Sequence, residues 1–254
     1  METTGTEALV VKDLRKGFGP LGVLGGISFS VERGELVCIL GPSGCGKTTM
    51  LRIAAGLIPF DAGTILINGE DIRKNRDDLK NVSVVFQEPR LLPWRSARQN
   101  VYLSLELRKD GRDGRDLEAV DSALALVGLS EFTNSYPHEL SGGMRQRVSL
   151  ARAIVTEPEI LLMDEPLTGL DLRNREELQD EILRIWSQKK VTLMLVTHDS
   201  AEAIHMADRI IVLSERPARI KSIISVRLPR PRPRDSDAVR EMENTIRGLF
   251  GEDI

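Results

Sequence analysis

A glycine-rich loop between an apolar run and a helical pattern most constrains the fold of this chain. The run is ELVCIL at residues 35 to 40, and the loop is GPSGCGKT at residues 41 to 48. In the segment that follows, apolar residues recur at helical spacing: Met50, Leu51, Ala54 and Leu57. Glycines in such a loop let backbone N–H groups converge on phosphate oxygens at a helix N-terminus. We therefore expect a strand, a phosphate-binding loop and a helix.

The loop matches the pattern GxxxxGK(S/T), which gives its last two residues particular tasks. Lys47 would reach the outer phosphates of a nucleotide, and Thr48 would offer its hydroxyl to Mg²⁺. A glycine turn with a solvated lysine is the structural alternative, and Cys45 is either redox-sensitive or a small residue at a tolerant position. The expected nucleotide contacts are Gly41, Pro42, Ser43, Gly44, Cys45, Gly46, Lys47, Thr48 and Thr49.

A second glycine-rich stretch, LSGGMRQR at residues 140 to 147, lacks a lysine. It offers glycine backbone and the start of the helix MRQRVSLARAIV, but not the charge to hold a triphosphate alone. This asymmetry suggests half of a site that another molecule completes. A glycine turn that caps the helix is a compatible structural explanation.

Two adjacent acids end another apolar run, ILLMDE at residues 160 to 165. Asp164 closes a buried strand, where a carboxylate needs a partner such as hydrated Mg²⁺. Adjacent residues of an extended strand point apart, so Glu165 would face an attacking water while Asp164 faces the metal. Two acids that simply start a helix are the alternative.

The remaining strands are predicted from short apolar runs. Runs at residues 8 to 11, 27 to 31 and 64 to 67, broken by Gly and Asp, indicate an antiparallel β region. Three further runs carry polar residues at their C-terminal ends, the edge where parallel α/β sheets bind ligands. These are NVSVVF at 81 to 86, EILLMDE at 159 to 165 and VTLMLVTHD at 191 to 199.

Helical periodicity fills the gap between the strands predicted at 81 to 86 and 159 to 165, and it resumes near the C-terminus. One face carries Ala97, Val101 and Leu105, and after the charged break KDGRDGRD at 109 to 116 another carries Leu117, Val120, Leu124 and Val127. Later helices follow Asp171, with Leu178, Ile182, Ile185 and Trp186 on one side, and begin near Ser200. The prolines of LPRPRPRD at 228 to 235 indicate a solvated stiff linker, or one touching anionic lipid, before a terminal helix with Val239, Met242, Ile246 and Leu249.

Composition narrows the class of protein. The 254 residues include 41% hydrophobic residues, enough for a sizeable core, and the net charge of −3 gives no global field for nucleic acid. Cys38 and Cys45 form neither a CxxC pair nor a ligand cluster, which favours a reducing cytosol. No stretch approaches the roughly 18 apolar residues of a membrane span, and the N-terminus lacks signal-peptide charge.

The motifs GPSGCGKTT, VFQEP, LSGGMRQR, ILLMDEP, LTGLD and VTHD, in that order, resemble the nucleotide-binding subunits of ATP-binding cassette (ABC) transporters. The resemblance covers nearly the whole chain. It implies an α/β fold: a P-loop ATPase core with a mostly parallel sheet, an N-terminal antiparallel β subdomain and an inserted α-helical subdomain. The ATPase domain would span residues 1–227, with its helical insertion at about 88–157, and a linker and C-terminal helix would occupy 228–254.

The resemblance also implies roles for particular residues. Glu165 would be the general base, His198 would position the γ-phosphate and water, and Gln87 would contact the metal and the lytic water. Thr48, Gln87 and Asp164 would hold Mg²⁺. The LSGG loop, with Ser141, Gly142 and Gly143, would bind the γ-phosphate of ATP held on the opposite subunit, and Asp171 would make contacts across the dimer. Phe18 lies where the family places an adenine-stacking ring, although a lone Phe also suits core packing.

Two local segments resemble one importer branch of the family, which handles nitrate, sulfonate, taurine and similar small anions. They are EPRLLPW at 88 to 94 and SERPARI at 214 to 220. Leu91, Leu92 and Trp94 would form either a permease contact or a locally packed patch. LTGLD in place of the commoner SALD form, and Thr48 in place of Ser, are departures that leave the chemistry intact.

The expected protein is thus an ATP-hydrolysing subunit that uses ATP and Mg²⁺ and lies peripherally on the cytoplasmic face of the inner membrane. Its partners would be permease subunits, a second identical or similar ATPase subunit and, indirectly, a substrate-binding protein, with no nucleic acid. A soluble ABC ATPase acting on DNA or ribosomes is the alternative, although such proteins tend to carry long insertions or two cassettes. A P-loop kinase or GTPase is a third possibility that would not need LSGG.

Overall fold

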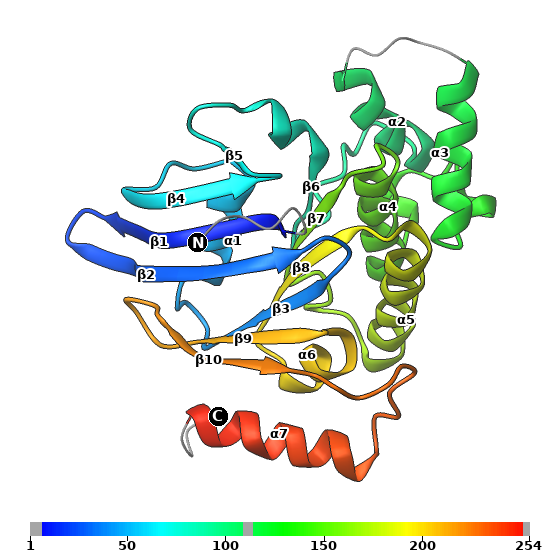
Figure 1. Ribbon diagram of the computed structural model, residues 1–254. Helices are drawn as coiled ribbons and strands as arrows, with labels where there is room; N and C mark the ends of the chain where they lie inside the picture. The colour runs from blue at the N-terminus through cyan, green and yellow to red at the C-terminus, as the bar shows by residue number, and fades with distance from the viewer. Residues whose placement is uncertain (1–6, 109–113, 251–254) are drawn as a thin grey trace. The chain divides into compact units, whose positions relative to one another are not determined.

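The computed structural model describes residues 7–108 and 114–250 (Figure 1). The contacts divide the chain into two compact units, residues 1–80 with 191–254, and residues 81–190. Most of the predicted break at 109–116 therefore lies outside the described residues. No helix in the described part of the chain is long and apolar enough to cross a membrane.

The first unit contains the predicted antiparallel region as a four-stranded sheet. Its order is β2-β1-β4-β5, and each neighbouring pair is antiparallel. The strands are β1 (Glu7–Phe18), β2 (Leu21–Glu32), β4 (Ala62–Ile67) and β5 (Glu70–Asp71). The first two strands extend well beyond the predicted apolar runs, and they pair with each other along this length, from Glu7 opposite Glu32 to Phe18 opposite Leu21.

The second sheet of this unit is built around β3 (Leu36–Leu40), the strand that leads into the glycine loop. It runs parallel to both β8 (Thr192–Thr197) and β9 (Arg209–Leu213), and β10 (Ile220–Ser225) pairs antiparallel with β9. All five residues of β3 are buried, as expected for a parallel strand covered on both faces. Strand β9 is not among the predicted strands, so the sequence analysis misses one neighbour of β3.

Helix α1 (Lys47–Ala54) follows the glycine loop and ends earlier than the apolar spacing predicts. Gly56 has φ 68°, its N–H bonds Ile53 O at 2.9 Å, and the Leu57 N–H bonds Arg52 O at 2.9 Å. This pair of bonds is a Schellman motif that closes the helix. The prediction that the helical spacing continues to Leu57 is therefore wrong, since Leu57 lies beyond the end of α1 and is 54% exposed.

The second unit contains two parallel strands, β6 (Val82–Val85) and β7 (Ile160–Asp164), and four helices. The helices are α2 (Ala97–Arg108), α3 (Gly114–Leu126), α4 (Gly142–Ile154) and α5 (Leu172–Lys189). Val120, Leu124 and Val127 are fully buried as predicted. Leu117 is 51% exposed, so the predicted apolar face of α3 is wrong at its first position. Short 3₁₀ turns complete the described elements at Asp77–Asn81, Ser130–Phe132 and Pro137–Glu139.

The chain returns to the first unit with α6 (Ser200–Met206) and ends with α7 (Asp237–Phe250), which packs against α6 (Figure 1). The segment between β10 and α7 is anchored by two arginines. Arg232 is only 4% exposed and donates hydrogen bonds to the carbonyls of Ile204 and Ala207, both at 2.6 Å. Arg230 pairs with Asp208 at 2.5 Å. The expectation of a solvated linker is wrong at Arg232, because its guanidinium satisfies carbonyls at the C-terminal end of α6.

We predict that Arg232→Gln lowers the free energy of unfolding by about 3 kcal/mol, because it leaves several buried carbonyls without their charged donor. Arg240→Gln is the control, since Arg240 is exposed and its guanidinium lies 3.7 Å from a carboxylate oxygen of the fully exposed Asp237. That change should stay within about 0.5 kcal/mol. Urea denaturation measures both values, and equal midpoints for the two variants would contradict the anchoring role.

Candidate functional site

The glycine loop of the first unit joins β3 to α1 and folds around the side chain of Lys47. This side chain is 4% exposed, and its Nζ donates to Gly41 O at 2.8 Å and to Pro42 O at 3.0 Å. The loop is closed by a bond from Cys45 N to Pro42 O at 3.2 Å. Lys47 is thus pre-positioned at the loop rather than extended into solvent.

Two loop positions require glycine. Gly44 has φ 75° and Gly46 has φ 120°, conformations that L side chains rarely adopt. A Cβ atom at Gly46 would also lie 2.8 Å from Val23 Cγ1 and 3.0 Å from Leu24 Cδ2. The loop is therefore pressed against β2, and this packing fixes the direction in which its backbone N–H groups point.

The loop fits a phosphate chain. Helix α1 begins at an N-cap glycine, Gly46, which has no side chain to accept a hydrogen bond from the first turn of the helix. An anion at this N-terminus would meet the N–H groups of that turn, the helix dipole and the Lys47 ammonium together. The donor set matches the chemistry of a nucleotide triphosphate.

The structure favours a packing role for Cys45 over a redox role. Its side chain is 2% exposed, and a Cβ atom built on Gly41 would lie 3.0 Å from its Sγ. Burial raises the pKa of the Cys45 thiol, although the nearby charge of Lys47 opposes that rise. Because the thiolate is the reactive form, a buried thiol with a raised pKa is a poor sensor at neutral pH.

Two other predicted residues lie in the first unit. Phe18 ends β1 and is 51% exposed, with Lys16 Nζ 4.9 Å from the ring centroid, so it is not a core residue. The exposed ring leaves a face for stacking. His198 directly follows β8 and is exposed, and the next residue, Asp199, caps α6 by accepting a hydrogen bond from Glu202 N at 3.1 Å.

The second unit holds the two predicted acids at the end of β7. Asp164 is the last residue of the strand and is 4% exposed. Glu165 has φ 45°, and its Oε2 accepts a hydrogen bond from Thr168 Oγ1 at 3.3 Å. The prediction explains the separation of the two side chains by the alternation of an extended strand. That explanation is wrong, because Glu165 lies in a left-handed turn and not in the strand. Backbone in this region costs energy for a non-glycine residue, and such positions cluster at functional sites.

Gln87 is exposed and follows β6, and helix α4 holds the loop on both sides of it. Gln146 Nε2 donates to Phe86 O at 3.2 Å. Arg152 donates to Pro89 O at 2.6 Å and to Arg90 O at 3.0 Å. The position of Gln87 is therefore tied to the helix that begins at the LSGG motif.

Asn100 of α2, just after this loop, is fully buried; its Oδ1 accepts a hydrogen bond from Leu92 N at 2.8 Å, and its Nδ2 donates to Arg95 O at 2.9 Å. These bonds fix a turn that presents Trp94, which is 70% exposed. The loop from 88 to 96 is thus rigid at its base and apolar at its tip.

The LSGG motif begins α4. Ser141 is the N-cap and accepts a hydrogen bond from Met144 N at 3.2 Å, as the structural alternative anticipated. Its hydroxyl proton remains available for donation. Gly142 has an open position for an approaching group, since a Cβ atom there would meet nothing closer than Arg145 Nη2 at 4.0 Å.

Asn174, which the sequence analysis misses, connects Asp171 to the LSGG motif. Asp171 caps α5 by accepting hydrogen bonds from Asn174 N at 3.0 Å and Asn174 Nδ2 at 2.5 Å, and these bonds lower the pKa of its carboxyl. A Cβ atom built on Gly143 would lie 3.1 Å from Asn174 Oδ1. Gln146, Arg152 and Asn174 are therefore the positioning residues of this unit, and no local pattern marks them.

The candidate residues thus fall into two groups. The first unit brings together the glycine loop, Lys47 and the helix start, and it also contains Phe18 and His198. The second unit contains Asp164 and Glu165 at the end of β7, and the LSGG motif near Asp171. It also contains Gln87, in a loop that side chains of α4 hold by hydrogen bonds.

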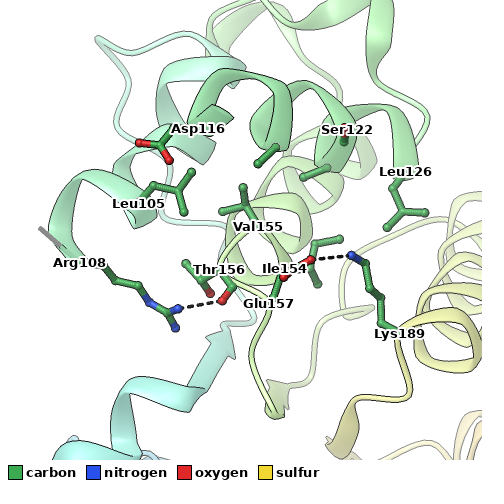
Figure 2. A pocket seen from close by; sticks show the side chains of 12 residues that line it. Leu105, Arg108, Asp116, Ser122, Leu126, Ile154, Val155, Thr156, Glu157 and Lys189 are labelled. Atoms are coloured by element: carbon green, nitrogen blue, oxygen red, sulfur yellow. Dashed lines mark hydrogen bonds and ion pairs between the residues drawn. The ribbon is translucent and has the colours of Figure 1, made fainter. Parts of the chain in front are cut away.

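A groove opens among the helices of the second unit (Figure 2). Its volume is about 620 Å³, and the ends of α2, α4 and α5 and one face of α3 line it. The floor is apolar, with Leu105, Val155 and Leu126. Arg108, which donates to Thr156 O at 2.7 Å, and the 3.1 Å pair of Lys189 with Glu157 provide its polar edge. Such a mixed lining suits an amphipathic segment of another chain.

The family model for ABC transporters matches residues 24–168. The aliphatic sulfonates import ATP-binding protein SsuB of Bacillus cereus is 41% identical over 241 residues, which cover 95% of this chain and 93% of that protein. The bicarbonate transport ATP-binding protein CmpD of Synechococcus elongatus is 40% identical over 239 residues, which cover 92% and 84%.

A solved dimeric structure of an ATP-binding cassette, in a post-hydrolysis state bound to ADP and Pi, has the same fold. Its TM-score is 0.77 at 30% identity, and the match covers 87% of this chain and all of that one. The α/β fold and the resemblance found in the sequence are thereby confirmed. The chain belongs to the ABC transporter family and is an ATP-binding, ATP-hydrolysing subunit of that family.

Proposed function

We propose that this ATPase subunit powers a membrane permease that imports a small anion such as nitrate, a sulfonate or taurine. Two copies, or this chain and a similar subunit, close around ATP and open after hydrolysis. The observation that carries the proposal is the pairing of a lysine-bearing phosphate loop with a lysine-free LSGG helix start in one chain. The relatives SsuB and CmpD, which are named for aliphatic sulfonate import and bicarbonate transport, support an anionic solute.

In this proposal the phosphate loop of each copy holds the nucleotide. Backbone N–H groups of Gly41 to Thr49 and the Lys47 ammonium bind the phosphates, and the exposed ring of Phe18 stacks on adenine. The donors Thr48, Gln87 and Asp164 offer the hard oxygen ligands that Mg²⁺ takes, and the ion needs few protein ligands because it keeps several waters. When bound, Mg²⁺ neutralises charge that develops on the phosphate oxygens.

Hydrolysis then needs a positioned water and a proton acceptor. Glu165 takes a proton from that water while the oxygen of the water forms a bond to the γ-phosphorus. The bond between the γ-phosphorus and the β,γ-bridging oxygen breaks at the same time, which leaves ADP and phosphate. Gln87 and His198 orient the water and the γ-phosphate. Preorganised donors stabilise the charge that spreads over the transferred group.

The second half of each site comes from the partner copy. Ser141, Gly142 and Gly143 at the N-terminus of α4 bind the γ-phosphate held by the partner, and Asp171 makes contacts across the dimer. The buried contact between Gly143 and Asn174, which Asp171 holds, ties these two elements into one surface. Helix α4 also holds the Gln87 loop through Gln146 and Arg152. Closure of the dimer on the N-terminus of α4 would therefore be transmitted to this loop through these two side chains.

The permease would dock on the helical insertion at about 88–157. The exposed Trp94 on its rigid loop and the 620 Å³ groove offer an apolar contact with a polar edge, which suits an amphipathic helix of a membrane protein. The chain would then lie peripherally on the cytoplasmic face of the membrane and meet a substrate-binding protein only indirectly. The ATPase domain would span 1–227 and the terminal segment 228–254, and no nucleic acid partner is needed.

We predict that Ser141→Asp separates the capping role of Ser141 from its role at the partner's nucleotide. Aspartate caps helices as well as serine does, so thermal stability should stay within about 1 °C. The new charge would repel a γ-phosphate, so ATP hydrolysis should fall at least about tenfold while ATP affinity of the monomer is kept. A variant with unchanged turnover would show that Ser141 only caps α4.

To test the transported solute, the genes adjacent to that of this chain are searched for a permease and a binding protein, and these proteins are reconstituted with this chain in vesicles. Binding protein loaded with a sulfonate, nitrate or taurine should stimulate ATP hydrolysis, and the same protein with a neutral sugar should not. Stimulation by the sugar or by a cationic solute alone would refute the assignment of nitrate, a sulfonate or taurine. Recovery of ribosomes or DNA, instead of a membrane protein, in an affinity purification of this chain would favour the soluble alternative.

A further inference from the structure

The segment SERPARI, residues 214–220, places an arginine beside the phosphate loop. A Cβ atom built on Gly44 would lie 3.8 Å from Arg216 Nη2, and Gly44 is at the centre of the loop. Arg216 is exposed, and no hydrogen bond or ion pair joins its guanidinium to another residue in the described ranges. A cation therefore stands at the loop without a protein anion to neutralise it.

Backbone hydrogen bonds hold this segment in place. Ser214 N donates to Arg219 O at 2.9 Å and Arg219 N donates to Ser214 Oγ at 3.0 Å, which closes the turn around Arg216. Ala218 N donates to Val23 O at 2.8 Å, and Gly25 N donates to Ala218 O at 2.8 Å, which ties the turn to β2. The backbone at Arg216 is thus fixed on both sides.

The same strands that hold Arg216 also hold the phosphate loop. Val23 and Leu24 of β2 lie against Gly46, and Leu213, the last residue of β9, lies against Gly41, where a Cβ atom would be 3.2 Å from Leu213 Cβ. Arg216 and the loop therefore share one rigid support. The charge of Arg216 also acts on the loop itself, because it lowers the pKa of the Cys45 thiol against the larger effect of burial.

We infer that Arg216 is a second cation of the nucleotide site and binds the α- and β-phosphate oxygens of ATP and ADP. In loops of this type the backbone cradles the α- and β-phosphates and the lysine reaches the β- and γ-phosphates. Gly44 belongs to that backbone cradle, so a guanidinium beside Gly44 would meet the α- and β-phosphates. Its planar fork suits two phosphate oxygens at once. This inference rests on the phosphate-loop assignment proposed above.

The test compares Arg216→Ala with Arg219→Ala, a matched exposed arginine in the same turn, by calorimetric titration of the isolated chain with ATP and with ADP, both with magnesium. Arg216→Ala should weaken both nucleotides by about fivefold, the effect of one partly solvated charge contact. Arg219→Ala should leave both affinities unchanged. Arg216→Lys should recover part of the loss, because it restores the charge without the fork, and this recovery separates lost charge from misfolding.

The inference would be overturned if Arg216→Ala and Arg219→Ala bound ADP with equal affinity. It would also be overturned if Arg216→Ala lost affinity for ATP but not for ADP. Lys47→Ala, measured alongside, reports on the phosphate-loop assignment. If Lys47→Ala abolishes binding while Arg216→Ala does not weaken it, only the role of Arg216 fails. If Lys47→Ala binds both nucleotides normally, the phosphate-loop assignment fails as well.

Discussion

The packing of the glycine loop against its neighbouring strands is the constraint on which the nucleotide site of this protein depends. Gly46 approaches β2 so closely that a Cβ atom would overlap Val23, and Gly41 is in similar contact with Leu213. The loop therefore cannot relax around the buried Lys47 side chain, whose Nζ is held by two loop carbonyls. A preorganised set of N–H groups costs no reorganisation when the phosphate arrives.

Helix α4 is to the second unit what the glycine loop is to the first, because it holds the candidate site residues of that unit in place. Its N-terminus carries the LSGG motif, its middle holds Phe86 through Gln146, and its last turn holds Pro89 and Arg90 through Arg152. In the proposed dimer, this helix would contact the partner's γ-phosphate at one end and the Gln87 loop along its length, and would so link nucleotide state to a membrane partner. Such a link requires two arrangements of the helix.

The sequence predicts the elements that local patterns mark and misses those that tertiary contacts decide. The strand, loop and helix around Lys47 and the strand ending at Asp164 follow from apolar runs and glycine chemistry. Strand β9, an apolar run of the same length as β3 and β7, is the exception, because the apolar pattern marks it and it could have been predicted. Leu57 looks helical because a Schellman motif leaves no mark in the apolar spacing. The left-handed Glu165, the burial of Arg232 and the proximity of Arg216 to Gly44 depend on partners far along the chain.

The central claim is that two chains share each ATP, one through Lys47 and the other through Ser141. Sedimentation of Glu165→Gln with saturating ATP and magnesium tests it most directly, because loss of the proton acceptor should stop hydrolysis and leave the closed state populated. We expect an ATP-dependent dimer that contains two nucleotides and disappears when Ser141→Asp is added. A Glu165→Gln chain that binds ATP fully and remains monomeric at high protein concentration would contradict the account.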